Sequence, residues 1–205
     1  MSFIFTIGHS NRDIKDFLNI LANYKINLVV DIRSVPYSAY ASVYNQPNLQ
    51  GILQIYKIEY VFMGDLLGGR PKDLYCYTKD GYWDYEGFIN SKKFNDGINR
   101  LLSFINDKQI VLMCTEFDPI ECHRSLIVGR FLKNRYNFLV NHIVNINEEI
   151  TQDDLENKLI KSHFPDMNVQ YSFFVEEEEV SIEKAYEKQI KEIFKKLKKS
   201  CSRVI

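Results

Sequence analysis

The sequence predicts an α/β protein in three layers, in which helices cover both faces of a central, mainly parallel sheet of about five strands, followed by a C-terminal helical extension. Short apolar runs alternate along the chain with segments whose apolar residues recur at the helical period, a pattern typical of such folds. The apolar runs are nearly continuous, as expected of strands that are buried on both faces. With 205 residues, 45% of them hydrophobic, the chain can bury one good core.

The first third of the chain supplies the first strands and helices. Residues 3–7 are apolar and predict a strand. The tetrapeptide at residues 10–13, Ser-Asn-Arg-Asp, resembles a capping box with Asp in place of Glu, and predicts that a helix starts there. Residues 28–32 are rich in β-branched side chains and predict the second strand. A short helix with proline in its first turn and a third strand follow, at residues 47–56 and 58–63.

The middle of the chain combines a long irregular stretch with the last strands of the sheet. Residues 64–84 are rich in Gly, Tyr and Asp, and irregular segments of this length inside a compact domain are usually functional or mobile. A helical region then spans about 86–105, with a break expected near Ser91. A strand, a helix and a final strand are expected at residues 109–113, 119–135 and 137–144.

The composition shifts beyond residue 147. We therefore divide the chain into an α/β domain, residues 1–147, and an extension packed on it, residues 148–205. Residues 170–175 favour one more strand. Apolar residues at helical spacing predict an amphipathic helix over residues 181–199, with a stripe formed by Ile182, Tyr186, Ile190, Ile193 and Leu197. Its many basic side chains indicate a solvated face, with contact to nucleic acid as the alternative.

Charge and terminal composition narrow the class of protein. The net charge is −1 and 26% of the residues are charged, which argues against a protein that coats nucleic acid through a large basic surface. The first residues lack the basic region of a signal peptide, and no window approaches the roughly 18 apolar residues of a membrane span. We therefore expect a cytoplasmic protein without membrane contact, whose four cysteines are thiols.

Residues 114–124, Cys-Thr-Glu-Phe-Asp-Pro-Ile-Glu-Cys-His-Arg, concentrate reactive side chains between the fourth strand and the next helix. The D-P-x-E pattern at residues 118–121, with the aspartate as N-cap, predicts that the helix starts there. Cys122, His123 and Arg124 then lie in its first two turns, where the helix dipole and free backbone N–H groups favour an anion and a thiolate. The motif therefore predicts an anion-binding site with an accessible thiol.

Other interpretations of this motif stay open. A Cys114–Cys122 disulfide is disfavoured because the predicted helix start holds the two residues apart. Zinc is disfavoured because the C-x7-C-H spacing matches no usual pattern, and because adjacent Cys122 and His123 would point about 100° apart on a helix. A phosphatase-type or rhodanese-type thiol loop needs a shorter spacing than the nine residues between Cys114 and Arg124. Cys114 can also be a core residue, and Arg124 can belong to a structural ion pair.

Polar residues also follow the first two strands. His9 comes after the first strand, and Asp31 and Arg33 close the second. Because ligands bind beyond the carboxyl ends of the strands in open α/β sheets, we expect these three side chains to gather at one edge with Cys114, Glu116 and Arg124. A buried Asp31–Arg33 ion pair and a capping or fully hydrogen-bonded His9 are the structural alternatives.

Two features of the long irregular stretch are compatible with a pocket. Gly68 and Gly69, followed by Arg70, permit close approach of the backbone to a ligand. A cluster of aromatic residues can stack a base or cover a pocket, and can equally form a hydrophobic lid on the core; it comprises Tyr75, Tyr77, Tyr82, Trp83 and Tyr85.

Four segments occur in order along the chain: T-I-G-H-S at residues 6–10, D-I-R-S-V-P-Y-S at 31–38, L-G-G-R at 67–70 and the motif at 114–124. In these segments the chain resembles the family catalogued as domain of unknown function 488, over about residues 6–144. The resemblance implies an α/β fold. It places Cys114 and Glu116 where the family often has a cysteine and an acidic residue, and Cys122-His123-Arg124 on its most distinctive tripeptide. It implies no particular reaction, and residues beyond 147 lie outside it.

We therefore expect an enzyme whose pocket lies at the carboxyl edge of the sheet and accepts an anionic, phosphate-bearing substrate, with a nucleotide or a nucleic-acid end favoured. The candidate nucleophiles are Cys122 and Cys114, and the acid–base candidates are Glu116 and His9. Substrate contacts are expected from Ser10, Asp31, Arg33, Gly68, Gly69, Arg70, His123 and Arg124. No metal or cofactor is expected. The alternatives are a non-catalytic nucleic-acid or nucleotide-binding module and a structural zinc-binding domain.

Overall fold

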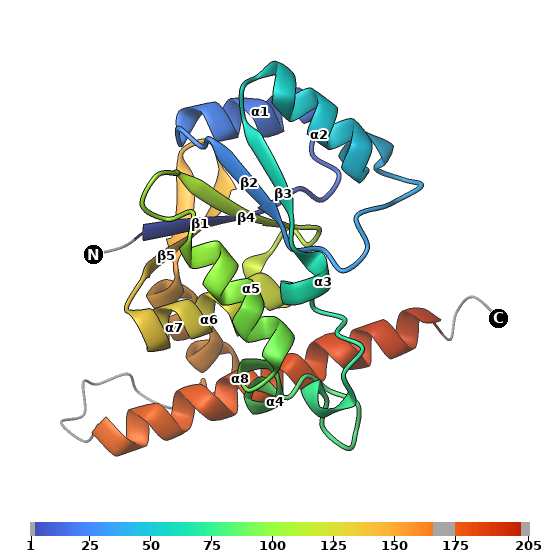
Figure 1. The fold of residues 1–205 in the computed structure, drawn as a ribbon. Coiled ribbons are helices and arrows are strands. Elements are labelled where there is room, and N and C mark those ends of the chain that lie inside the picture. Colours follow the sequence, from blue (N-terminus) through green and yellow to red (C-terminus); the bar gives the residue numbers. More distant parts are fainter. Residues whose placement is uncertain (1–2, 166–174, 202–205) are drawn as a thin grey trace.

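A computed structural model describes residues 3–165 and 175–201 (Figure 1). At its centre is a six-stranded sheet in the order β3-β2-β4-β1-β5-β6. Strand β1 pairs in parallel with β4 and β5, β2 pairs in parallel with β3 and β4, and β5 pairs antiparallel with β6. The predicted mainly parallel sheet is confirmed. Its strands are β1 (Phe3–Gly8), β2 (Leu28–Asp31), β3 (Glu59–Phe62), β4 (Ile110–Cys114), β5 (Leu139–Asn145) and β6 (Glu148–Thr151).

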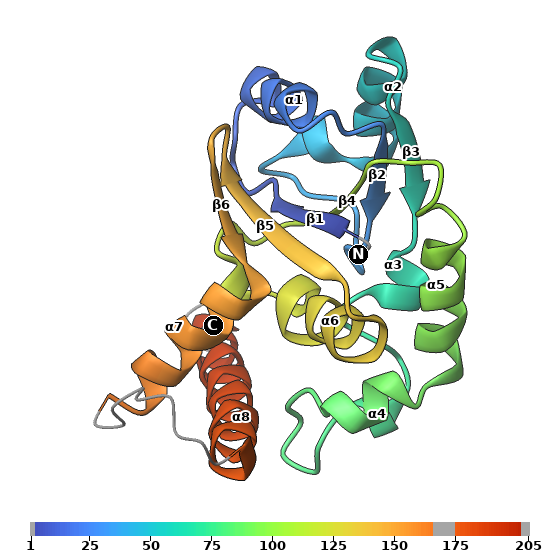
Figure 2. The same ribbon diagram turned by 90° about the vertical axis from the view of Figure 1, so that its left-hand side faces the viewer.

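Helices cover both faces of the sheet, which gives the predicted three layers (Figures 1 and 2). On one face, α1 and α2 pack against strand side chains such as Phe5, Val29 and Val111. On the other, the core contains Val30 and Leu112 and is closed by α3, α4, α5 and α6. The bounds are α1 (Ile14–Asn23), α2 (Gln46–Ile55), α3 (Gly64–Leu67), α4 (Tyr85–Ile89), α5 (Lys92–Leu102) and α6 (Arg130–Tyr136).

The sixth strand was not predicted. β6 reads Glu-Glu-Ile-Thr, and its exposed and half-buried residues carry none of the apolar signal of the inner strands. It lies at the edge of the sheet, where one side of a strand needs no strand partner and polar residues are tolerated. Thr151 ends β6 and also caps α7 (Gln152–His163) through a reciprocal capping box with Asp154.

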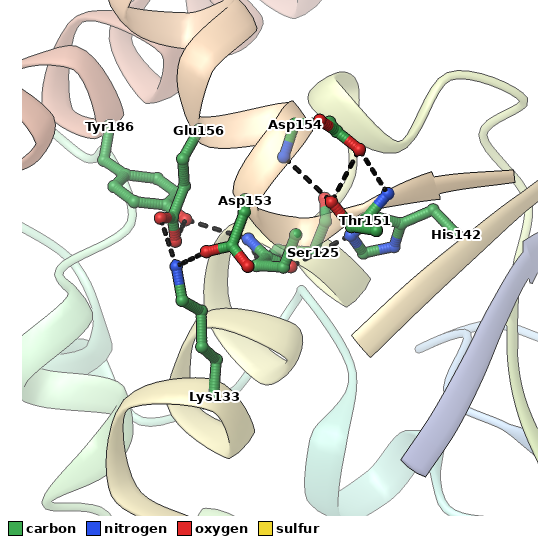
Figure 3. A network of polar contacts seen from close by, with 9 residues as sticks. Ser125, Lys133, His142, Thr151, Asp153, Asp154, Glu156 and Tyr186 are labelled. Carbon is green, nitrogen blue, oxygen red and sulfur yellow. Dashed lines mark hydrogen bonds and ion pairs between the residues drawn. The ribbon is translucent and has the colours of Figure 1, made fainter. Parts of the chain in front are cut away.

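The C-terminal segment packs on the α/β core through a third apolar cluster. Helices α7 and α8 (Val175–Cys201) bury Leu155, Tyr186 and Ile190 against Ile120 and Leu126. Figure 3 shows polar contacts along this seam: Lys133 of α6 pairs with two acidic residues of α7, Asp153 and Glu156, and Glu156 also accepts a hydrogen bond from the Tyr186 hydroxyl. No helix within the described residues combines the length and apolarity needed to cross a membrane.

The predicted C-terminal elements fit the structure unevenly. Tyr186, Ile190 and Ile193 of the expected helical stripe are buried, and Ile182 is half-buried. The Leu197 side chain lies outside the described residues, as does the strand expected at 170–175, apart from Val175, where α8 begins.

Of two predicted helix boundaries, the structure confirms one and corrects the other. The break near Ser91 is confirmed, because Ser91 separates α4 from α5 and its hydroxyl accepts a hydrogen bond from the Phe94 amide. The predicted start at residues 10–13 is wrong in detail: α1 begins at Ile14 and its cap is Asp13. Ser10 instead adopts a left-handed conformation with φ of 47°, and its amide donates to the Thr115 carbonyl, which ties the turn to the end of β4.

Candidate active site

The carboxyl ends of three neighbouring strands bring the predicted polar residues together. Strands β2, β4 and β1 are adjacent in the sheet, and Gly8 at the end of β1 is in register with Cys114 at the end of β4. On the other side of β4, Asp31 is in register with Met113. Gly8 is required here, because a Cβ at this position would lie 1.8 Å from the Glu116 carbonyl oxygen. The expected gathering of strand-end residues is thus present, as two adjoining clusters.

The first cluster surrounds Arg33. Its guanidinium forms a buried ion pair with Asp31, with Nη2 2.6 Å from Oδ2, and the same carboxylate oxygen accepts from the Tyr60 hydroxyl at 2.6 Å. A second hydrogen bond runs from Nη2 to the Tyr44 carbonyl at 2.8 Å. Burying a charged pair is favourable only when further hydrogen bonds satisfy it, and this pair has them. Asp31 therefore holds Arg33 in one orientation.

His9 is the third member of this cluster. Its Nδ1 lies 2.8 Å from the Ser10 carbonyl oxygen, which can only accept, so Nδ1 carries the proton and Nε2 accepts from Arg33 Nη1 at 3.0 Å. Burial, together with the Arg33 charge, lowers the pKa of His9 to about 4. The ring stacks on Tyr44, with centroids 4.2 Å apart. His9 is thus a neutral, buried imidazole that supports Arg33.

The second cluster contains two thiols, an imidazole and a carboxylate. Glu116 Oε2 lies 3.0 Å from the sulfurs of both Cys114 and Cys122. His123 Nδ1 lies 3.8 Å from each of the same sulfurs. The three atoms contributed by the cysteines and the histidine all lie within 4.8 Å of one another, and within the described part of the chain this is the one group of its kind.

The cluster shifts the pKa values of its two thiols in opposite directions. Burial raises the pKa of Cys114 well above that of a free thiol and raises the pKa of Glu116. Burial also opposes ionisation of Cys122, but the hydrogen bond from Cys114 and the charges of Arg124 and His123 outweigh it and lower the Cys122 pKa well below its usual value. The pKa of His123 is raised: burial opposes the charged form, and the neighbouring Cys122 thiolate favours it. These shifts favour a negative charge on Cys122 and a positive charge on His123.

The helix start predicted at residues 118–121 is wrong, and the difference explains how the cluster forms. Asp118 caps only the 3₁₀-turn Pro119–Glu121, through the Ile120 amide at 3.0 Å. The backbone is extended at Cys122, with φ −129° and ψ 141°, and a π-helix, Arg124–Gly129, begins after His123 and continues into α6. The side chains of Cys122 and His123 are therefore not held apart by helical geometry and converge on Cys114.

Arg124 is fully buried and spans the back of the cluster. Its Nη1 and Nη2 donate to the carbonyls of Glu116 and Phe117 at 2.6 and 2.9 Å, and Nε lies 3.3 Å from the Thr6 hydroxyl. Among the described residues, no carboxylate forms an ion pair with it. Arg124 thus fixes the turn that carries Glu116 and leaves its charge beside the thiols.

A pocket of about 620 Å³ opens onto the two clusters. Three members of the second cluster, Cys114, Glu116 and His123, line it, whereas Cys122 lies behind them with no exposed surface. The thiol predicted to be accessible is thus buried: Cys114 is 3% exposed and Cys122 is 0% exposed. The other lining residues are Arg33, Ser34, Val35, Tyr37, Ser38, Gly69, Arg70, Trp83, Thr115, Glu121, Ile193 and Lys196.

The paired glycines serve close packing inside the pocket wall. A Cβ on Gly69 would lie 2.8 Å from Nδ1 and Cγ of His123, and a Cβ on Gly68 would lie 2.5 Å from the Ser34 hydroxyl. The Ser34 hydroxyl also accepts a hydrogen bond from the Arg70 amide at 2.8 Å. Gly69 and Arg70 line the pocket; Gly68, like Ser10 and Asp31, is absent from its lining.

Several pocket residues were missed by sequence reasoning. Ser34 lies within the D-I-R-S-V-P segment, and its position beside Arg33 could have indicated that it belongs to the pocket. Ile193 and Lys196 come from α8, and nothing in their local sequence indicates that the helix folds back over the strand ends. Trp83 belongs to the predicted aromatic cluster, whose Tyr77 and Tyr85 pack with it on the core, while Trp83 itself also reaches the pocket.

Fold and site together define an α/β protein with a polar pocket at the carboxyl edge of a parallel sheet. Residues 13–131 match the family described as Domain of unknown function DUF488, and because this match covers more than half of the chain, the chain belongs to that family. No curated protein and no solved structure is detectably similar to it. The matched residues include both clusters except His9, and they end before β5 and the C-terminal helices.

Proposed function

We propose that the protein is an enzyme that binds an anionic, phosphate-bearing substrate in the strand-edge pocket. The observation that carries this proposal is the lining of one pocket by three cationic side chains, Arg33, Arg70 and Lys196, together with the reactive cluster of Cys114, Glu116 and His123. Clefts with a few converging polar groups are the usual place for small-molecule binding. The same arrangement puts the bound substrate next to the groups that act on it.

The three cations differ in how free they are to bind an anion. Arg33 is oriented by Asp31, and Lys196 pairs with Glu121 at the rim of the pocket. Arg70 is exposed, and among the described residues no carboxylate forms an ion pair with it. Arginine binds phosphate through two parallel N–H donors. We therefore assign the main phosphate contact to Arg70.

Trp83 favours a nucleotide over inorganic phosphate. Its Nε1 donates to the Gly69 carbonyl at 2.7 Å, which fixes the ring in the pocket wall. A fixed aromatic ring stacks a base at a gain of about 1–3 kcal/mol. The substrate class that fits both the cations and the ring is a nucleotide or the end of a nucleic-acid strand.

The proposal separates contact residues from positioning residues. Cys114, Glu116 and His123 face the pocket and are assigned contact with the reacting part of the substrate. His9 and Asp31 are assigned the task of orienting Arg33, and Arg124 that of fixing the Glu116 turn. The sequence alone had suggested direct contact with the substrate for His9, Asp31 and Arg124; we now assign these three residues supporting roles.

Fluorescence provides a direct test, because Trp83 is the single tryptophan and lines the pocket. Titration with a nucleoside triphosphate should change its emission in a saturable way. Arg70→Gln should weaken binding by about tenfold or more, the effect of losing one charge-assisted contact. Arg100→Gln removes an exposed arginine of α5 that is not in the pocket, and should bind like the unchanged protein. Equal affinity in the two variants would contradict the proposed contact.

Turnover distinguishes the enzyme from the non-catalytic alternative. The enzyme should convert the bound nucleotide, as measured by phosphate release or chromatography, and lose this conversion in Glu116→Gln while still binding through Arg70. A nucleic-acid-binding module would instead bind through the exposed lysines of α8, Lys184, Lys191 and Lys195, with strong dependence on salt and none on Arg70.

A further inference from the structure

The two thiols and the imidazole of the second cluster have the spacing of ligands to one metal ion. Zinc binds sulfur at about 2.3 Å and imidazole nitrogen at about 2.0–2.1 Å, which places neighbouring ligand atoms of a tetrahedral site roughly 3.6–3.8 Å apart. His123 Nδ1 lies 3.8 Å from the sulfur of Cys114 and 3.8 Å from that of Cys122. All three donor atoms lie within 4.8 Å of one another, so small side-chain movements would bring them to bonding distance from a single ion.

Glu116 is placed to supply the fourth ligand. Its Oε2 lies 3.0 Å from both sulfurs, so the carboxylate already contacts two of the three proposed ligands. Carboxylate oxygens bind zinc at about 2.0–2.2 Å, and a small shift of this side chain is enough to reach an ion held by the other three. Because Glu116 lines the pocket, the fourth position is the one that faces a substrate.

The hydrogen bonds around the cluster orient its members as ligands. His123 Nε2 lies 3.1 Å from the Ile32 carbonyl oxygen, and because a carbonyl can only accept, Nε2 carries a proton. Metal binding, which requires a neutral imidazole, would therefore remove the proton from Nδ1 and leave that nitrogen as the ligand. The Arg124 amide donates to the Cys122 sulfur at 3.5 Å. Outer contacts of this kind fix the imidazole tautomer and stabilise thiolates in metal sites.

The charge balance also fits an ion. Two thiolates and one carboxylate carry three negative charges, a divalent ion adds two positive charges, and the buried Arg124 guanidinium supplies the third within the same region. Arg124 is fully buried, and among the described residues no carboxylate forms an ion pair with it. Such a charge is costly to bury unless it is balanced nearby.

We propose that Cys114, Cys122 and His123, with Glu116 as the fourth ligand, bind one zinc ion at the inner end of the pocket. Soft thiolates with imidazole select zinc over magnesium or calcium. The objection that Cys122 and His123 diverge on a helix does not apply, because the helix begins after them. Catalytic zinc typically has three protein ligands and an exchangeable fourth position; Glu116 would fill that position until a substrate oxygen displaced it, and the ion would then polarise that oxygen. The site rests on ligand spacing and needs no anionic substrate.

Metal analysis of the full chain tests the site. The protein is reduced, stripped with a chelator, reloaded with zinc and dialysed, and the zinc content and affinity are measured by elemental analysis and competition with a chromophoric chelator. We expect one zinc per chain with a dissociation constant on the order of nanomolar. A stoichiometry near zero, or micromolar or weaker binding, would overturn the proposal.

Cysteine variants separate this site from adventitious binding. Cys122→Ser should lose at least about a hundredfold in zinc affinity, and Glu116→Gln about tenfold. Cys76→Ser is the matched control: Cys76 is also a buried thiol, but its sulfur lies against the Gly87 carbonyl, away from the cluster, so zinc binding should be unchanged. Equal affinity in Cys122→Ser and the unchanged protein would refute the ligand set.

Cobalt provides a readout that does not depend on the folding of a variant. In the unmodified protein, Co²⁺ should give intense visible absorption of a tetrahedral ion and thiolate-to-metal charge-transfer bands. A weak octahedral spectrum would overturn the site even if Cys122→Ser did not fold. Arg70→Gln should keep its zinc, so failure of anion binding and failure of metal binding are distinguishable.

Discussion

Each of the two buried arginines at the strand edge is held by its own set of acceptors. The acceptors of Arg33 are the Asp31 carboxylate, the Tyr44 carbonyl and the His9 imidazole, and the Tyr60 hydroxyl donates to the same carboxylate. Arg124 is satisfied by backbone carbonyls, which neutralise its hydrogen-bonding needs without neutralising its charge. The positive charge of Arg124 therefore acts on the neighbouring thiols. Arg33 differs because the fold gives it a carboxylate partner.

His142 makes stability depend on pH. The ring lies between the Thr6 hydroxyl, 2.8 Å from Nδ1, and the Gln152 side-chain oxygen, 2.9 Å from Nε2. Burial, with the Arg124 charge, lowers its pKa to about 3. Below the unfolded value of about 6.5, the unfolded chain binds a proton that the folded chain does not. Its contribution is therefore complete above that pH and is lost progressively as the pH falls toward 3.

We expect His142 to account for about 2 kcal/mol of the stability lost between pH 7.5 and pH 5. Urea unfolding at the two pH values measures this loss. His142→Gln should be less stable at pH 7.5 because it disturbs the Thr6 contact, but its stability should fall by about 2 kcal/mol less than that of the unchanged protein on going to pH 5. The same pH dependence in both proteins would show that another group is responsible.

At the scale of elements, local signals predicted capping residues better than they predicted the helices that follow them. The D-P-x-E pattern at residues 118–121 correctly marks a turn with Asp118 as its cap. The turn stops after Glu121, and the backbone becomes extended where Cys122 packs behind Cys114, a contact between distant parts of the fold. No local pattern reports that contact, so the convergence of Cys122 and His123 on Cys114 could not be predicted from the sequence.

Two helical glycines should respond in opposite ways to the same substitution. Gly51 lies on the exposed side of α2, and an added Cβ would meet no other atom within 4 Å. Gly51→Ala should therefore stabilise the protein by about 0.5–1 kcal/mol through helix propensity alone. Gly97 of α5 is buried, and its Cβ would lie 2.7 Å from Leu67 and 2.9 Å from Leu66 of α3.

Gly97→Ala should consequently destabilise the protein by about 1–3 kcal/mol, because overpacking against α3 outweighs the gain in propensity. Urea midpoints of the two variants, compared with the unchanged protein, provide the measurement. Stabilisation by both substitutions would mean that α3 can move away from α5 at little cost, and α3 ends directly before Gly68 and the pocket residue Gly69.

For the whole molecule, the sequence predicted the sheet because buried parallel strands carry a strong apolar signal. It also predicted which strand ends gather polar residues, since parallel strands end at one edge. It did not predict that α8 reaches the pocket: Ile193 and Lys196 line it because Tyr186 and Ile190 pack on the third apolar cluster. That packing depends on the relative placement of segments, which periodicity within one helix cannot report.

The packing of α8 leads to a prediction about cooperativity. Gln189 donates to the Ile120 carbonyl at 2.9 Å, and Phe194 lies edge-on to Trp83 with ring centroids 5.2 Å apart. Trp83 is the single tryptophan, so its fluorescence reports the contact with α8, whereas far-UV circular dichroism reports all helices. Because these contacts join the C-terminal segment to the core, we expect the two signals to follow one urea transition.

Ile190→Ala sharpens this test, because Ile190 lies in the seam between α8 and the core and is 4% exposed. If the C-terminal segment folds with the sheet, removing this side chain should lower the stability of the entire protein by about 2–4 kcal/mol and shift both curves together. If α8 is an independent element, fluorescence should change at a lower urea concentration than circular dichroism. Coincident curves would mean that the rim of the pocket supplied by α8 is as stable as the sheet that supplies its floor.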